Sequence, residues 1–164
     1  NIEAYYQRRG GAYFESCSRA VAEALLDVNA ERLAAALNRA LSTFVSIRGT
    51  SGMARGESCY HDMLDGIVES ASSLITKHCP DTDEGEECAD ITILSDDFTA
   101  AMLLEIKCAS SGSDLRCKAQ EALRQIIDKD CAETMRYCGP SKIFGFGIAF
   151  FGRQCAVEAQ ELPL

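Results

Sequence analysis

Two short apolar runs near the middle of the chain limit its fold more than any other feature. Residues 89–94 and 101–107 each have the length and the apolar content of a β-strand. Only the polar residues 95–99 separate the two runs. A connection this short and polar predicts an antiparallel β-hairpin.

Helical patterns precede the hairpin. Residues 13–27 and 30–44 carry apolar side chains at helical spacing, and Asn29 can cap the second of these helices. A third helix is expected over residues 57–75. Residues 48–56 contain three glycines and no apolar period, which predicts a flexible link. We therefore divide the chain into an N-terminal helical subdomain, residues 1–52, and a second part, residues 53–164.

After the hairpin, the pattern predicts a long amphipathic helix over residues 114–137, which Gly139-Pro140 stops. Two strands follow, over residues 143–150 and 154–161, with Gly152-Arg153 as the turn between them. The complete order is three helices, two strands, one helix and two strands. This order predicts an α/β fold of the α+β sandwich type, in which helices flank one sheet.

Composition and charge limit the possible partners. A chain of 164 residues that is 47% hydrophobic and 25% charged is typical of one globular domain. It contains no apolar run near the ~20 residues that a membrane helix needs. The net charge of -9 disfavours strong non-specific binding to nucleic acid, which requires a basic surface. Residues 81–97 hold eight acidic residues and no Lys or Arg, as in a solvated loop, although carboxylates also gather at cation sites.

The nine cysteines include no C-x-x-C pair, so zinc and thioredoxin-like sites lose their main support. Several cysteines fall inside apolar segments, where a reduced thiol behaves as a small hydrophobic group. We interpret them as buried or half-buried thiols of a reducing cytosol, and expect a cytoplasmic protein without a membrane partner.

The second strand of the hairpin carries a charged pair, Glu105 and Lys107, directly after four apolar residues. Residues two apart on a strand point to the same face, so both charged groups project together, while Met102, Leu104 and Ile106 face a core. Asp90 opens the first strand. If the two strands pair, Asp90 lies beside Glu105, within reach of one cation.

These residue types fit a site for a hard cation. Mg²⁺ prefers one or two carboxylates together with waters and phosphate oxygens. Asp90 and Glu105 can supply the carboxylates, and the backbone carbonyl of Ile106 a third oxygen. Lys107 can orient an attacking water and neutralise charge that develops on a phosphate. By itself, however, the spacing is weak evidence, because Glu and Lys two apart on a strand commonly form a solvated pair.

Five segments extend this pattern. They are a helix with E-x-x-Y-H, a loop that ends in Asp, an E-x-K strand, an A-L-x-Q-I helix and a glycine-rich apolar strand. In this chain they are Glu57-Ser58-Cys59-Tyr60-His61, Gly85-Glu86-Glu87-Cys88-Ala89-Asp90, Glu105-Ile106-Lys107, Ala122-Leu123-Arg124-Gln125-Ile126 and Gly145-Phe146-Gly147-Ile148-Ala149-Phe150. With these segments in this order, the chain resembles the PD-(D/E)xK nucleases. It looks like the branch often found C-terminal to an AAA-type ATPase-like domain, and the similarity covers nearly the whole chain.

The resemblance implies a restriction-endonuclease-like core with a central mixed β-sheet and an N-terminal helical extension. It adds Glu57 and Gln125 to the catalytic residues Asp90, Glu105 and Lys107, and it implies that His61 and Tyr60 contact substrate. His61 can equally be a buried, hydrogen-bonded structural histidine. Two positions depart from the family pattern, since Cys88 stands where a basic residue is usual and Cys131 replaces a Tyr.

The resemblance implies a nuclease that uses Mg²⁺, with Mn²⁺ as a substitute, and that acts on DNA in preference to RNA. The acidic charge keeps a second reading open, in which the domain is catalytically inactive and serves as a binding or regulatory module for an ATPase. A third reading is a phosphoester hydrolase for small nucleotides. The expected partners are nucleic acid, an AAA-type ATPase-like domain in the same polypeptide and, as a further option, other copies of the chain in a homo-oligomer.

Overall fold

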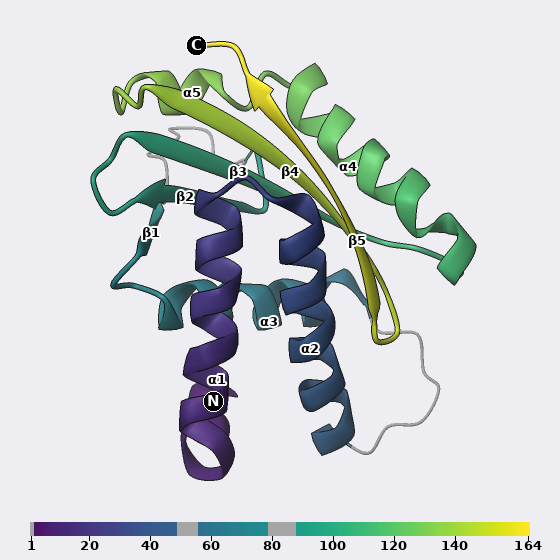
Figure 1. The fold of residues 1–164 in the computed structure, drawn as a ribbon. Helices are drawn as coiled ribbons and strands as arrows, with labels where there is room; N and C mark the ends of the chain where they lie inside the picture. Colours follow the sequence, from purple (N-terminus) through teal and green to yellow (C-terminus); the bar gives the residue numbers. More distant parts are fainter. Residues whose placement is uncertain (1, 49–55, 79–87) are drawn as a thin grey trace.

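The computed structural model describes residues 2–48, 56–78 and 88–164, and confirms the predicted α+β sandwich. A five-stranded mixed sheet lies between helices that cover both of its faces (Figure 1). The glycine-rich link at 49–55 and the acidic loop up to residue 87 lie outside the described residues, as does the boundary predicted after residue 52. Within the described residues, no helix is both long and apolar enough to span a bilayer.

Two long helices open the chain, α1 (Ile2–Leu26) and α2 (Ala30–Arg48). Both extend beyond the predicted limits. Asn29 caps α2 as expected, because its side-chain Oδ1 accepts a hydrogen bond from the backbone N–H of Arg32 at 3.0 Å. Val28 adopts a φ of 51° between the helices, which lets the chain reverse within three residues.

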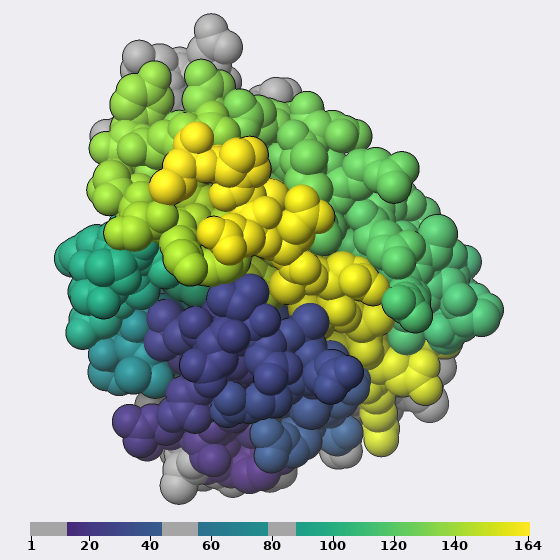
Figure 2. Space-filling model, turned by 45° about the horizontal axis from the view of Figure 1, so that its top comes forward, coloured from purple at the N-terminus to yellow at the C-terminus, as the bar shows by residue number. Residues whose placement is uncertain are grey.

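The first three helices cover one face of the sheet. Apolar side chains from α1, α2 and α3 (Glu57–Ser70) share one core with the inward residues Met102, Leu104 and Ile106. Helix α2 also reaches the C-terminal strand, which lies beside it in Figure 2. There the side-chain Oδ1 of Asn38 accepts a hydrogen bond from the backbone N–H of Cys155 at 3.1 Å. The N-terminal helices therefore pack directly against the sheet.

The sheet has the strand order β1-β2-β3-β4-β5. Its strands are β1 (Ile75–His78), β2 (Ile91–Ser95), β3 (Ala100–Cys108), β4 (Lys142–Phe151) and β5 (Gln154–Leu162). The predicted hairpin is present as the antiparallel pair of β2 and β3. Asp97 stabilises its turn by accepting hydrogen bonds from the Ser95 hydroxyl at 2.7 Å and the Thr99 amide at 3.1 Å.

Strand β4 pairs with β3 in parallel and with β5 in an antiparallel hairpin, which makes the sheet mixed. Helix α4 (Leu115–Asp128) is the crossover between the two parallel strands and covers the second face. A parallel pair needs such a crossover, because its two strands run in the same direction.

Two predicted helices were too long. The helix expected over 57–75 ends at Ser70, and Ile75–His78 forms edge strand β1 instead. The helix expected over 114–137 divides into a 3-10 turn (Gly112–Asp114), α4 and the short α5 (Glu133–Arg136). Asp130 interrupts it with a φ of 47°, which a continuous helix cannot contain.

The prediction for the cysteines is also wrong in part. Cys88 and Cys131 form a disulfide across 43 positions of sequence. Cys117 and Cys138 are free but exposed rather than buried. Neither pattern was visible in the sequence, because disulfide pairing depends on which cysteines the fold brings together.

Helix α4 lies unusually close to the sheet at Gly147 on β4. A Cβ atom at this position would lie 2.0 Å from the carbonyl oxygen of Ala119 and 2.5 Å from the amide nitrogen of Leu123. Both atoms belong to the backbone of α4, so no side-chain rotation can relieve the clash. The absence of a side chain at Gly147 therefore sets the distance between α4 and β4.

Gly147→Ala should consequently push α4 away from the sheet and lower the free energy of unfolding by about 3 kcal/mol. Gly66→Ala is the matched control, since a Cβ there meets nothing within 4 Å and α3 gains a better helix former. We expect this control to stabilise the chain by about 0.5–1 kcal/mol. Urea unfolding measures both changes, and equal stability of the two variants would contradict the close contact.

Candidate active site at the open end of β3

Strand β3 continues beyond the strand that pairs with it on one side. The last pair with β2 joins Ile91 to Leu104, whereas β3 extends to Cys108. Two carboxylates take the place of the missing strand. Asp90 Oδ2 accepts a hydrogen bond from the backbone N–H of Ile106 at 2.7 Å, and Glu57 Oε1 accepts one from Cys108 at 3.3 Å. The open edge of β3 is thus lined with acidic side chains.

Asp90 and Glu105 come together at this edge. Asp90 stands one position before the last strand pair, which brings it opposite Glu105. Opposed residues of an antiparallel pair project to the same face, so the two carboxyl groups are neighbours. The Glu105 side chain is only 7% exposed, and this burial, followed by the charge of Asp90, raises its pKa from 4.5 to about 7.

Helix α4 contacts Glu105 and Lys107, the two side chains that the alternation along β3 predicted to share one face. Gln125 Nε2 donates a short hydrogen bond to Glu105 Oε1, and Lys107 Nζ lies 3.8 Å from Glu121 Oε1. Glu105 and Lys107 therefore project from one face of β3, toward α4. The Glu105 carboxyl group is thus held between the loop residue Asp90 and the helix residue Gln125.

His61 supports the backbone of Asp90. Its Nε2 lies 3.1 Å from the Asp90 carbonyl oxygen, an acceptor, so Nε2 carries the proton and donates. The hydrogen-bonded structural role is the one that this geometry supports. His61 lies one turn after Glu57 on α3, so the same helix delivers both residues to the end of β3.

Tyr60 does not face the site. Its side chain is 2% exposed, its ring stacks on Phe150 with centroids 4.5 Å apart, and its hydroxyl donates to the Gly152 carbonyl at 3.0 Å. These contacts do not support the expectation that Tyr60 contacts substrate, which stays a prediction. It is a core residue that ties α3 to the turn between β4 and β5.

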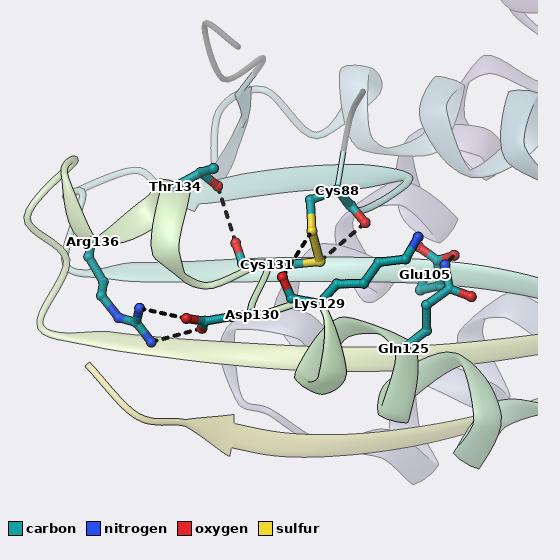
Figure 3. The surroundings of a disulfide bond; sticks show 8 residues. All are labelled: Cys88, Glu105, Gln125, Lys129, Asp130, Cys131, Thr134 and Arg136. Carbon is teal, nitrogen blue, oxygen red and sulfur yellow. Dashed lines mark hydrogen bonds and ion pairs between the residues drawn. A yellow bond between two sulfur atoms is a disulfide. The ribbon is translucent and has the colours of Figure 1, made fainter. Parts of the chain in front are cut away.

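Lys129 is a neighbour of the site that the sequence did not single out. It follows α4, and Figure 3 shows its side chain extending toward Glu105 and Gln125. Its positive charge, like that of Lys107, lowers the pKa of Glu105 and so opposes the effects of burial and Asp90. The sequence signal was its place as the Lys of a Q-I-x-x-K segment, four residues and one helical turn after Gln125.

The donor atoms at this edge suit a small hard cation. The N–H and C=O of one residue point to the same side of a strand, so the Ile106 carbonyl opens toward Asp90, as its N–H does. Two carboxylates and one carbonyl oxygen match the ligands of Mg²⁺, with water completing the shell. Among the described residues, no three His, Cys, Asp or Glu side chains gather as a metal cluster. The ion would therefore depend on the backbone oxygen and on water.

The raised pKa of Glu105 predicts how stability depends on pH. The folded chain holds the Glu105 proton more tightly than the unfolded chain does, so stability falls as pH rises from about 4.5 to about 7 and then levels off. Glu105→Gln removes this titration and should remove that part of the pH dependence. Urea unfolding of the wild type and of Glu105→Gln between about pH 4 and pH 8 provides the measurement. A constant difference between them would contradict the raised pKa.

The charge of Lys129 should modulate the same titration. Lys129→Met removes a positive charge that lowers the pKa of Glu105, so the midpoint of its titration should move to higher pH. Lys142→Met is the control, because Lys142 pairs with Ala100 at the opposite end of β3. NMR of the Glu105 carboxyl carbon reports the midpoint directly. An unchanged midpoint in Lys129→Met would show that Lys129 does not act on Glu105.

Comparison with known proteins identifies the family. The model of the PD-(D/E)XK nuclease superfamily matches residues 56–160, from the start of α3 into β5. Searches among curated proteins and among solved structures gave no significant match. The family match covers well over half of the chain and includes Glu57, Asp90, Glu105, Lys107 and Gln125. The chain therefore belongs to the PD-(D/E)XK nuclease superfamily.

Proposed function

We propose that this chain hydrolyses phosphodiester bonds of nucleic acid, with DNA preferred over RNA, in a reaction that depends on Mg²⁺. The observation that carries the proposal is the meeting of Asp90 with Glu105-Ile106-Lys107 at the open end of β3. Membership of a nuclease superfamily supports it independently.

Asp90, Glu105 and the carbonyl of Ile106 would hold the ion, with Mn²⁺ as a substitute. When bound, Mg²⁺ would polarise the phosphate and acidify a water molecule. The hydrogen bond from Ile106 N–H occupies one oxygen of Asp90 and leaves the second for a cation. Burial makes the Glu105 anion unfavourable by itself, so a cation beside it would relieve this cost.

Lys107 would act on the phosphate and on the attacking water. Its ammonium group projects from the same face as Glu105, and its side chain retains 21% exposure. At 3.8 Å, its contact with Glu121 is loose enough to be exchanged for a phosphate oxygen. A fixed cation next to the phosphate stabilises the charge that develops during hydrolysis.

Gln125 and Glu57 would complete the site from the two sides of β3. Gln125 donates to Glu105 and so fixes the carboxyl group at the position from which it would bind the ion. Glu57 binds the N–H two residues beyond Ile106, which separates the two bonded nitrogens by about 7 Å along the strand. At this distance, Glu57 can position water beside the primary site.

A catalytically inactive binding module is the main alternative. Two observations favour it. The net charge of -9 is unfavourable for holding nucleic acid, and a pKa of about 7 leaves much of Glu105 protonated at neutral pH in the metal-free chain. In this reading, the domain would regulate an attached ATPase. Hydrolysis of small nucleotides is a third reading, which demands less basic surface.

The remaining expectations of the sequence analysis stay proposals. They are an AAA-type ATPase-like domain in the same polypeptide, a cytoplasmic location and self-association into a homo-oligomer. An attached domain would also offer a route to a basic surface, which the net charge of -9 disfavours in this chain.

Removal of either charged group of the E-x-K strand should abolish cleavage. In a DNA cleavage assay with Mg²⁺, we expect Glu105→Ala and Lys107→Ala to lose about 10²-fold or more of the rate while remaining folded. Lys142→Ala is the matched control, because this lysine is exposed at the opposite end of the parallel β3–β4 pair. Equal cleavage by the wild type and both site variants would reject the assignment.

Calorimetric titration with Mn²⁺ separates the enzyme from the inactive module. The proposed site predicts one bound ion, whose affinity rises with pH up to about 7 as Glu105 loses its proton. Asp90→Asn should weaken this binding strongly because it removes one of two carboxylates. Absence of binding to the wild type would favour the inactive module.

A further inference from the structure

The disulfide between Cys88 and Cys131 joins the two segments that carry the candidate site. Cys88 lies two residues before Asp90, and Cys131 lies two residues after Lys129 (Figure 3). The bond is therefore close in sequence to Asp90, a proposed metal ligand, on one side. On the other side it is close to Lys129, whose positive charge lies near Glu105. No other described pair of cysteines is bonded.

The Cys131 end of the bond is fixed to α4. Its backbone N–H donates to the Ile126 carbonyl at 3.1 Å, and the N–H of Lys129 donates to the Gln125 carbonyl at 3.1 Å. Cys131 is 1% exposed and packs among the buried residues beneath α5. A displacement of the Cys131 backbone would consequently disturb the end of α4, from which Lys129 extends.

The Cys88 end is tied to the open edge of β3. Only Ala89 separates Cys88 from Asp90, whose carboxylate binds Ile106 N–H and whose carbonyl accepts from His61. Cys88 itself is half-buried, so a small thiol reagent can reach this sulfur more easily than that of Cys131.

We propose that the Cys88–Cys131 disulfide is a redox-sensitive brace, which holds the Asp90 segment against α4 and makes the geometry of the site depend on oxidation state. Two bonded sulfurs are about 2.05 Å apart, a distance that two thiols cannot approach. Reduction therefore separates Cys88 from Cys131 and releases the constraint on Asp90. The consequence for metal binding rests on the proposed function, whereas the brace itself does not.

The exchange needs a small-molecule disulfide as oxidant and a dithiol as reductant. On oxidation, the Cys88 thiolate attacks the reagent and releases one thiolate, and Cys131 then attacks the mixed disulfide and releases the second. Two protein thiols and one reagent disulfide thus become one protein disulfide and two reagent thiols. In reduction, one thiolate of the dithiol attacks Cys88 and displaces the Cys131 thiolate, which takes up a proton. The second thiolate of the reagent then attacks the mixed disulfide, which frees Cys88 as a thiol and leaves the reagent as a cyclic disulfide.

Hydrogen exchange of the Ile106 amide tests the brace without any metal, because this N–H reports the position of the Asp90 carboxylate. We expect reduction of the wild type to accelerate its exchange by about tenfold. The Leu33 amide, which donates to Asn29 at the start of α2, should not respond. Alkylation and mass spectrometry should find two fewer modified cysteines in the oxidised protein.

Two variants control the experiment. Cys88→Ser/Cys131→Ser should behave like the reduced wild type under both conditions. Cys117→Ser removes an exposed free thiol of α4 and should respond like the wild type. An Ile106 exchange rate that is the same in both oxidation states overturns the proposal, as does failure of the disulfide reagent to form the bond.

Mn²⁺ affinity distinguishes failure of the brace from failure of the proposed function. We expect the oxidised protein to bind Mn²⁺ about three- to tenfold more tightly than the reduced protein. Equal affinity in both states overturns the effect on the ion. If neither state binds Mn²⁺ but Ile106 responds to reduction, the metal-dependent function fails and the brace stands. If Mn²⁺ binds and Ile106 does not respond, the brace fails and the function stands.

Discussion

The hydrogen bond from Ile106 N–H to the Asp90 carboxylate is the interaction on which the candidate site depends. It forms where β2 has ended and β3 continues, at a backbone group that has no strand partner on that side. An unpaired N–H group inside a fold is costly, so a carboxylate is held there whether or not a cation is present. The same bond holds Asp90 beside Glu105.

The second face of the sheet supplies the rest of the site through a packing constraint. Because Gly147 has no side chain, the backbone of α4 lies directly on β4. This close approach brings Gln125 within hydrogen-bonding distance of Glu105. The packing that buries Glu105 also raises its pKa. The positive charges of Lys107 and Lys129 counter this effect, as a bound cation would.

Local patterns in the sequence predicted those parts of the fold that depend on local interactions. The hairpin, the cap at Asn29 and the common face of Glu105 and Lys107 all follow from strand or helix periodicity and from short turns. The edge strand β1 and the break at Asp130 did not follow. Strand β1 has only four residues and depends on β2 for its pairing. The break in the helix lies at the left-handed φ of Asp130, which the apolar spacing does not reveal.

The site residues also divide into those that local patterns predicted and those that depend on tertiary packing. The spacing along β3 predicted Glu105 and Lys107, and the resemblance added Glu57 and Gln125, which the fold brings to the same end of β3. The core position of Tyr60 was not predicted, because a motif does not tell which of its side chains packs into the core. Lys129 was missed because its closeness to Glu105 results from the docking of α4 onto the sheet, which sequence spacing does not encode.

A crystal structure of the chain soaked with Mn²⁺ tests the central claim most directly. The account predicts one anomalous peak at the open end of β3, about 2.1 Å from oxygens of Asp90 and Glu105 and from the Ile106 carbonyl. A chain that leaves this position empty while it binds the ion elsewhere, or that shows no ion at all, would contradict it.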